Sequence, residues 1–168
     1  DPRWAGVTFI GSSKVGWHLR QVVSPGVRVF LEHGGSAPMI VMPSANIERA
    51  LAAAVKHAFY HSGQVCISLQ RLFVHVDVEA DFRQKLIHEI EKLKVGDARL
   101  AETDCGPLIR SRDLERVQSW LVEAVASGAR VLTGGERLGR RLMRPALVDH
   151  VPIAAKLFQE EVFGPVLV

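Results

Sequence analysis

The stretch from residue 27 to residue 42 reads VRVFLEHGGSAPMIVM. Its first half places apolar side chains at alternate positions, which predicts a β-strand over residues 27–31 that ends at Glu32. A pair of glycines then turns the chain, and residues 38–42 form an apolar run that predicts a second, buried strand. The stretch therefore predicts two strands, the first of which ends in a carboxylate.

On both sides of this stretch, strand-like and helix-like segments alternate. Before and around the two strands above, we predict a strand at 7–10, a helix from about 13 to 22, and a helix from an N-cap at Asn46 to about His61. A strand at 71–76 and a helix through Phe82, Leu86, Ile90 and Leu93 follow. We then predict a helix from a cap at Ser111 to a stop at Gly128, a strand at 129–132, a turn at 133–139 and an extended segment at 143–151. Pro145 in the last segment predicts a sheet edge. This alternation predicts an α/β fold with a Rossmann-like, largely parallel sheet and flanking helices.

The composition is that of a globular protein and argues against two classes of partner. The net charge of +3 comes from 21 basic and 18 acidic residues that are scattered along the chain. The densest basic stretch, residues 137–144, contains no aromatic side chain for stacking on bases, so we predict no nucleic-acid partner. No apolar run approaches the roughly 18 residues of a membrane span, so we predict no membrane partner.

The cysteine content and the chain ends bear on the cellular context. Two cysteines are too few for a disulfide framework, which favours a reducing compartment such as the cytoplasm. The first residues, Asp1-Pro2-Arg3-Trp4, show neither an initiator methionine nor a signal-peptide pattern, so we interpret the chain as a piece of a longer protein. The last residues, 165–168, form an apolar run typical of a strand in mid-course, and we expect an open strand edge there.

Cys66 lies in the segment SGQVCIS at residues 62–68, just past the predicted end of a helix. A loop on a rigid scaffold is a typical place for a reactive group, and the thiolate of a cysteine is a nucleophile. A lone cysteine is also common as a small buried hydrophobic side chain. Both interpretations of Cys66 stay open on the residues alone, whereas we interpret Cys105 as structural.

Two further candidates lie at strand ends, where the ligands of α/β sheets collect. Glu32 closes a strand and precedes glycines that permit close approach of a substrate; a solvated carboxylate in a turn is the alternative. Residues 9–16, FIGSSKVG, form a strand, a glycine turn and a helix start, where backbone N–H groups suit a phosphate. This segment does not match the dinucleotide fingerprint, and Trp17 and His18 stand where a P-loop has Lys and Ser or Thr, so a plain capped turn is the alternative.

A metal pair is the remaining pattern to consider. His57 and His61 are four residues apart on one predicted helix, which is the spacing of two zinc ligands. Ala58 stands where the zinc-protease motif has a glutamate, so we predict no metal site.

Five blocks of the chain together resemble the aldehyde dehydrogenase superfamily from end to end. In order, they are FIGSSKVG at 9–16, LEHGG at 31–35, GQVC at 63–66, GPL at 106–108 and EEVFGPV at 160–166. Each block is short, but the order and spacing of all five are specific to the family.

The resemblance implies NAD- or NADP-dependent oxidation of an aldehyde to a carboxylic acid. It implies that Cys66 is the nucleophile, which forms a thiohemiacetal and then a thioester, and that Glu32 is the base that activates water to hydrolyse the thioester. The family stabilises the oxyanion with backbone N–H at the cysteine and an Asn side chain upstream of this chain. The residues implied to bind the cofactor are Gly11, Ser12, Ser13 and Gly16 near the pyrophosphate, Glu161 at the nicotinamide ribose, and Phe163 beside it.

The resemblance also implies how the chain is organised. Residues 1–31 would end a coenzyme-binding domain, and residues 32–168 would form most of a truncated catalytic domain. We expect the full-length protein to be a homo-oligomer, as family members generally are. We also expect the 168-residue chain alone to be inactive, because most of the cofactor site would be missing.

The chain departs from the family at two places. His33 stands where the family usually has Leu, and beside Glu32 it is expected to alter the local charge. Ser36-Ala37 stand where Lys and then Ser or Asn are usual.

Three other classes of function remain to be weighed. A CoA-acylating aldehyde dehydrogenase would use a thiol in place of water, and the retention of Glu32 argues against it. A cysteine hydrolase needs a His paired with Cys66, and none can be assigned. A catalytically silent homologue is disfavoured because Cys66, Glu32 and Glu161 are all retained.

Overall fold

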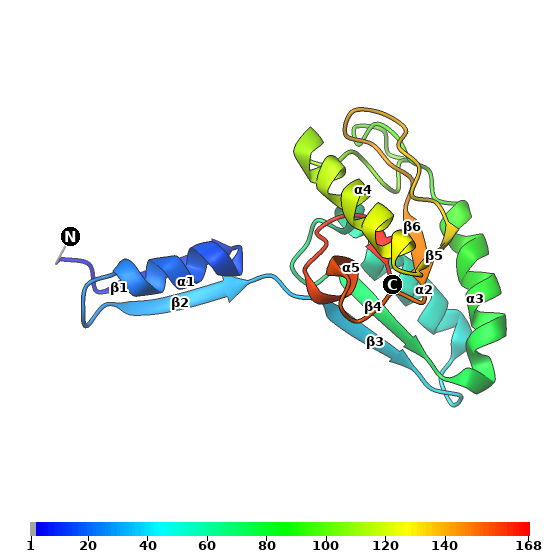
Figure 1. Ribbon diagram of the computed structural model, residues 1–168, viewed down its shortest axis with the longest axis horizontal. Coiled ribbons are helices and arrows are strands. Elements are labelled where there is room, and N and C mark those ends of the chain that lie inside the picture. The colour runs from blue at the N-terminus through cyan, green and yellow to red at the C-terminus, as the bar shows by residue number, and fades with distance from the viewer. Residues whose placement is uncertain (1–2) are drawn as a thin grey trace. The chain divides into compact units, whose positions relative to one another are not determined.

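The computed structural model of the protein describes residues 3–168 and divides the chain into two compact units, Asp1–Gly35 and Ser36–Val168 (Figure 1). Of the four residues on which the interpretation as a piece of a longer protein rests, the first two lie outside the described part. In the sequence, the boundary between the units follows Gly35, four residues after the predicted boundary at Leu31. Their assignment to a coenzyme-binding and a catalytic domain stays a prediction, and each unit is described by itself below.

The first unit consists of strand β1 (Gly6–Gly11), helix α1 (Ser13–Val22) and strand β2 (Arg28–His33). The two strands are parallel, as the helical crossover between them requires. Helix α1 begins after Ser12, whose backbone is extended, and ends before Val23, which is extended as well. These elements lie where the sequence predicts them.

The second unit contains the remaining strands. Strands β3 (Ala37–Val41) and β4 (Leu69–Val74) pair in parallel, and β5 (Arg130–Thr133), β6 (Ala146–Asp149) and β7 (Val166–Leu167) form a second ladder. Val168 joins the two ladders, because its N–H donates to the carbonyl of Gln70 (2.9 Å) and its carbonyl accepts from Leu72 (2.7 Å). The strand order is therefore β3-β4-β7-β6-β5, with only β5 antiparallel, and the predicted α/β class is confirmed.

Helices cover both faces of this sheet. Helices α2 (Ile47–Phe59) and α3 (Val76–Glu91) share a core with Leu147 and Leu167, whereas α4 (Ser111–Ala126) and the short α5 (Lys156–Gln159) share a second core with Val148 and Val166. Neighbouring residues of β6 and β7 point to opposite faces, so each strand supplies both cores. Figure 1 shows α4 and α3 on different sides of the sheet.

Several boundaries follow the predicted chemistry. The side chain of Asn46 caps α2 by accepting from the N–H of Arg49 (3.0 Å), and Gly128 follows α4 with a φ of +106°, in the left-handed region that favours glycine. The cap of α4 differs: Arg110 occupies the N-cap with an extended backbone, and Ser111 is the first helical residue. Leu93 lies just beyond the end of α3.

Two predictions about sheet edges are wrong. Pro145 does not mark an edge, because β6 lies between β5 and β7; the proline precedes β6 by one residue, where no ladder N–H is needed. The strand at residues 165–168 has no open edge on the described chain, since it is flanked by β6 and β4.

Candidate active site

Cys66 lies in an exposed turn that follows a sharp end to helix α2. The helix was predicted to reach His61, but it ends at Phe59, and a short turn of 3-10 helix, η1 (Tyr60–Gly63), follows. His61, Ser62 and Gly63 all have positive φ (47°, 58° and 70°) and redirect the chain. The carbonyl of Val65 then accepts from the N–H of Ser68 (2.9 Å), which closes a turn with Cys66 in its middle.

Polar side chains hold this turn on the fold. Ser68 Oγ donates to the last carbonyls of α2, at His57 and Ala58 (both 3.2 Å). Ser62 is buried, and its Oγ donates to the carbonyl of Gly106 (2.8 Å). Gln64 Oε1 accepts from the N–H of Ile109 (2.9 Å). The Cys66 turn is therefore tied to the GPL block at 106–108.

The EEVFGPV block comes close to the same turn at Gly63. A Cβ atom built on Gly63 would lie 2.1 Å from the carbonyl oxygen of Gly164, so only glycine fits this approach of two backbones. Three of the five blocks, which are far apart in the sequence, therefore meet in the second unit. The position of Cys66 in an exposed loop agrees with the sequence analysis, and its role as nucleophile stays a prediction.

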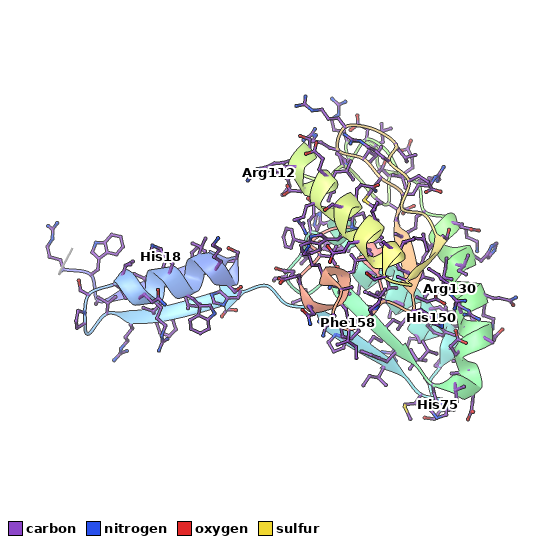
Figure 2. All side chains as sticks on the ribbon, in the orientation of Figure 1. His18, His75, Arg112, Arg130, His150 and Phe158 are labelled. Atoms are coloured by element: carbon purple, nitrogen blue, oxygen red, sulfur yellow. The ribbon has the colours of Figure 1, made fainter. Side chains whose placement is uncertain are left out.

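The segment with Glu161 and Phe163 is held by residues from β4 and α4. The side-chain amide of Gln70 donates to the carbonyls of Leu157 (3.1 Å) and Glu160 (2.7 Å) and accepts from the N–H of Val162 (2.9 Å). Arg71 donates to the carbonyl of Phe158 and stacks over its ring; Figure 2 labels this ring. The segment ends in Phe163, which has a φ of +45° and is 37% exposed.

Arg116, in α4, contacts the backbone of this segment and interacts with the charge of Glu161. Its Nη2 donates to the carbonyl of Val162 (2.7 Å). Burial lowers the pKa of the Arg116 guanidinium, while the carboxylates of Asp113 and Glu161 act in the opposite direction. The Glu161 carboxylate therefore lies close enough to the Arg116 guanidinium for the two charges to interact.

The two thiols differ in environment. Cys105 is buried, and its Sγ donates to Ser62 Oγ (3.4 Å). Burial raises the pKa of the Cys105 thiol, and the bond to Ser62 opposes this rise only in part. Cys66 is exposed. A buried thiol with a raised pKa is a poor nucleophile, so the contrast favours Cys66 as the reactive cysteine.

The first unit carries the other predicted site residues. Ser12 is the N-cap of the ten-residue helix α1, and its side chain makes no capping hydrogen bond. Glu32 is exposed on β2 and pairs in register with Ile10, which is 76% exposed, on the face opposite α1. Their predicted roles as a phosphate-binding loop and a base are not tested by these positions.

His33 does not lie beside the carboxylate of Glu32, contrary to the expectation. Successive side chains of a strand point to opposite faces, so His33 faces α1 while Glu32 faces away from it. The ring of His33 meets Trp17 edge to face (centroids 5.3 Å apart), and its Nε2 is buried without a hydrogen-bond partner. Gly16 permits this packing, because a Cβ there would lie 2.0 Å from His33 Nε2.

The histidine pair considered as metal ligands does not share a helix. His57 is in α2, whereas His61 follows the helix end with a left-handed backbone, so the four-residue helical spacing does not apply. Within residues 3–168, no group of three or more His, Cys, Asp or Glu is placed to hold a metal ion. In the same residues, no helix is both long and apolar enough to cross a membrane.

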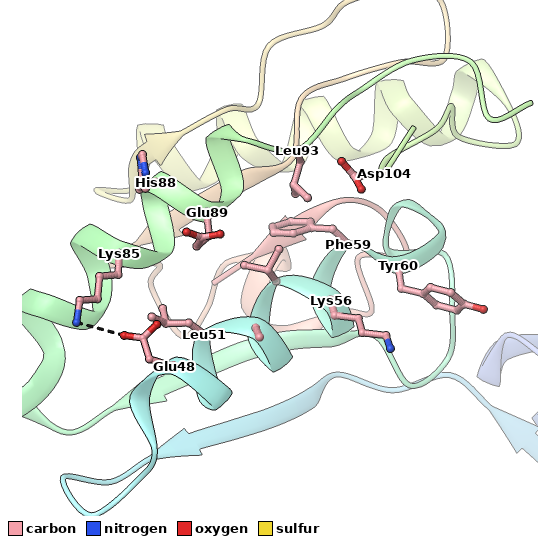
Figure 3. Close-up of a pocket in the computed structure, with 12 residues that line it drawn as sticks. Glu48, Leu51, Lys56, Phe59, Tyr60, Lys85, His88, Glu89, Leu93 and Asp104 are labelled. Atoms are coloured by element: carbon pink, nitrogen blue, oxygen red, sulfur yellow. Dashed lines mark ion pairs between the residues drawn. The ribbon is translucent and has the colours of Figure 1, made fainter. Parts of the chain in front are cut away.

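A groove of about 610 Å³ lies between α2 and α3 (Figure 3). Leu51 and Phe59 contribute apolar surface to its floor. At its rim, Lys85 Nζ forms an ion pair with Glu48 Oε1 (3.6 Å). Neither Cys66 nor Glu161 lines it. The groove is therefore distinct from the place where the three sequence blocks meet.

Sequence reasoning missed three residues that hold this site: Ser62, Gln70 and Arg116. Each binds a backbone group that lies more than 40 positions away in the chain. A polar residue inside a predicted buried strand is the only local signal, and Gln70, between Leu69 and the remainder of β4, gives it most clearly.

Comparisons with known proteins agree with these observations. The model of the aldehyde dehydrogenase family matches residues 1–168. The chain is 40% identical over 159 residues to a 3-sulfolactaldehyde dehydrogenase of Priestia aryabhattai (94% of this chain, 33% of the relative) and 37% identical over 169 residues to succinate-semialdehyde dehydrogenase [NADP(+)] 1 of Mycobacterium tuberculosis (99% and 37%). It also superposes on the crystal structure of aldehyde dehydrogenase 21 from Physcomitrella patens, in complex with the reaction product succinate, with a TM-score of 0.94 at 34% identity (99% and 34%).

The chain thus spans about a third of the length of each of these relatives. Because the family model covers the whole sequence, and the fold and the five blocks agree with it, the chain belongs to the aldehyde dehydrogenase family.

Proposed function

We propose that the full-length protein containing this chain oxidises an aldehyde to a carboxylic acid with NAD or NADP. The observation that carries this proposal is the exposed Cys66 turn, fixed by the Gly106 and Gly164 segments within a chain of the aldehyde dehydrogenase family. A nucleophile on an anchored turn starts close to its reactive geometry, which lowers the entropic part of the barrier.

In the proposed reaction, the Cys66 thiolate adds to the aldehyde carbon and forms a thiohemiacetal oxyanion. A bound nicotinamide dinucleotide supplies the hydride acceptor, and loss of hydride from the same carbon leaves a thioester on Cys66. Glu32 then removes a proton from water, which attacks the thioester carbonyl. The C–S bond breaks, the carboxylic acid leaves and the Cys66 thiolate is restored.

The residues present fit a dinucleotide. The N-terminus of α1 offers backbone N–H groups to a phosphate, and the Ser12 hydroxyl is not used for capping. Glu161 offers a carboxylate, the usual partner of ribose hydroxyls, and the partly exposed Phe163 offers an aromatic surface nearby in the chain. We therefore assign Gly11, Ser12, Ser13, Gly16, Glu161 and Phe163 to cofactor binding.

The names of the relatives suggest where a search for the substrate should start. Two of them act on aldehydes that carry a second, acidic group, a sulfonate or a carboxylate. We propose that the aldehyde oxidised here is also a short one with an acidic group. A CoA-acylating reaction is the alternative, and the retained Glu32 favours hydrolysis over transfer to a thiol.

The test uses the full-length protein with succinate semialdehyde, 3-sulfolactaldehyde and a neutral aldehyde of similar length, each with NAD and NADP. Formation of reduced cofactor is followed by absorbance, with and without CoA. Turnover that needs no CoA and is lost in Cys66→Ser supports the proposal. Turnover only with CoA, or full activity in Cys66→Ser, contradicts it.

A further inference from the structure

Gln70 and Ser62 are the two buried polar side chains among residues 3–168, and the reaction above uses neither. Gln70 lies in strand β4 at 4% exposure, next to the buried Leu69. A buried amide without partners would cost stability, and here both N–H donors and the oxygen of the amide bind one segment. The amide binds the carbonyls of Leu157 and Glu160 and the N–H of Val162.

The position of these three bonds is informative. Two of the bonded residues, Glu160 and Val162, are the neighbours of Glu161 on either side. Backbone groups on both sides of Glu161 are thereby tied to strand β4 through Gln70. The segment has little regular structure of its own, since α5 ends at Gln159 and β7 begins at Val166.

We infer that Gln70 is a positioning residue for the cofactor: it orients Glu161, and through it the ribose contact, without touching the cofactor. This inference rests on the proposed role of Glu161 in cofactor binding. Arg116 complements the arrangement by donating to the carbonyl of Val162 (2.7 Å), whose N–H is bound by Gln70.

The experiment uses full-length Gln70→Met, which keeps the length of the side chain and removes the amide. Cofactor affinity is measured by titrating the fluorescence of the reduced nicotinamide. We expect a loss of about tenfold or more, the amount by which one charge-assisted hydrogen bond changes binding. The KM for aldehyde and the rate of Cys66 alkylation should stay within about twofold, because the Cys66 turn is anchored by other residues.

Three further variants make the result decisive. Gln70→Glu keeps the acceptor for Val162 and loses both donated bonds, so it should weaken cofactor binding as well and serves if Gln70→Met does not fold. Gln118→Met is the matched control, since Gln118 is a half-buried glutamine that donates to the carbonyl of Gly135, away from this segment. It should lower thermal stability and leave cofactor affinity unchanged. Glu161→Gln tests the ribose contact itself.

The outcomes separate the two proposals. Weakened cofactor binding in both Glu161→Gln and the Gln70 variants supports the inference. Weakened binding in Glu161→Gln with normal binding in the Gln70 variants overturns it and leaves the proposed function intact. Normal binding in Glu161→Gln removes the ribose contact from the proposed function and overturns the inference with it. Equal losses of aldehyde KM, Cys66 reactivity and cofactor affinity in Gln70→Met would show a general structural role and also overturn it.

Discussion

Replacing Gly63 by alanine tests how the Cys66 turn is built. The added Cβ would lie 2.1 Å from the Gly164 carbonyl oxygen, about 1.3 Å short of the 3.4 Å at which ordinary contact begins. The neighbour is backbone, so either the Cys66 turn or the segment after Phe163 must move. At a φ of +70°, alanine also costs roughly 1–2 kcal/mol of backbone strain before the contact is counted.

A shift of this size should lower both the rate of the reaction and the stability of the fold. Misplacement of a reacting group by about 1 Å can cost about a hundredfold in rate. In the full-length enzyme we therefore expect kcat/KM for the aldehyde to fall by about two orders of magnitude, and the free energy of unfolding to fall by more than the roughly 1–2 kcal/mol of strain alone.

Gly128→Ala is the matched control. Gly128 also has a positive φ, +106°, but a Cβ there has nothing within 4 Å. In Gly128→Ala, backbone strain should lower the free energy of unfolding, measured with denaturant, while kcat/KM stays unchanged. Wild-type kcat/KM in Gly63→Ala, or an equal loss of activity in Gly128→Ala, would refute the proposed role of the close approach between residues 63 and 164.

Three other predictions concern the reacting groups and the assembly. Limiting iodoacetamide should label Cys66 and spare Cys105, because burial shields the second thiol and raises its pKa; peptide mass spectrometry showing preferential label on Cys105 would contradict this. Glu32→Gln in the full-length enzyme should give a burst of reduced cofactor followed by a steady state slower by roughly a hundredfold to ten-thousandfold, and unchanged turnover in stopped-flow absorbance would exclude Glu32 as the base. The full-length protein should be a homo-oligomer by light scattering, and a strictly monomeric, soluble protein would contradict that expectation.

Local chemistry made most of the fold predictable. The N-cap of Asn46, the glycine after α4 and the alternation in residues 27–31 each act within a few residues, and the structure contains the elements they predict. The family blocks likewise located the Cys66 turn and the Glu161 segment, because short motifs keep their order along the chain.

The errors arose where distant residues decide the outcome. Helix α2 ends two residues early because the turn that follows must approach Gly164, about 100 positions away. The segment at 165–168 is interior because β4 and β6 enclose it, which no local pattern reveals. His33 was placed beside Glu32 because adjacency in sequence was treated as adjacency in space, whereas a strand separates neighbouring side chains onto opposite faces.

The most direct test of the central claim is to trap the covalent intermediate in full-length Glu32→Gln. The enzyme is mixed with aldehyde and cofactor, quenched in acid within the burst, digested and analysed by mass spectrometry. If Cys66 is the nucleophile and Glu32 the base, the peptide with Cys66 gains the mass of the acyl group in amounts that match the reduced cofactor formed. A full burst of reduced cofactor with no acyl group on Cys66, or with the acyl group on Cys105, would contradict the claim.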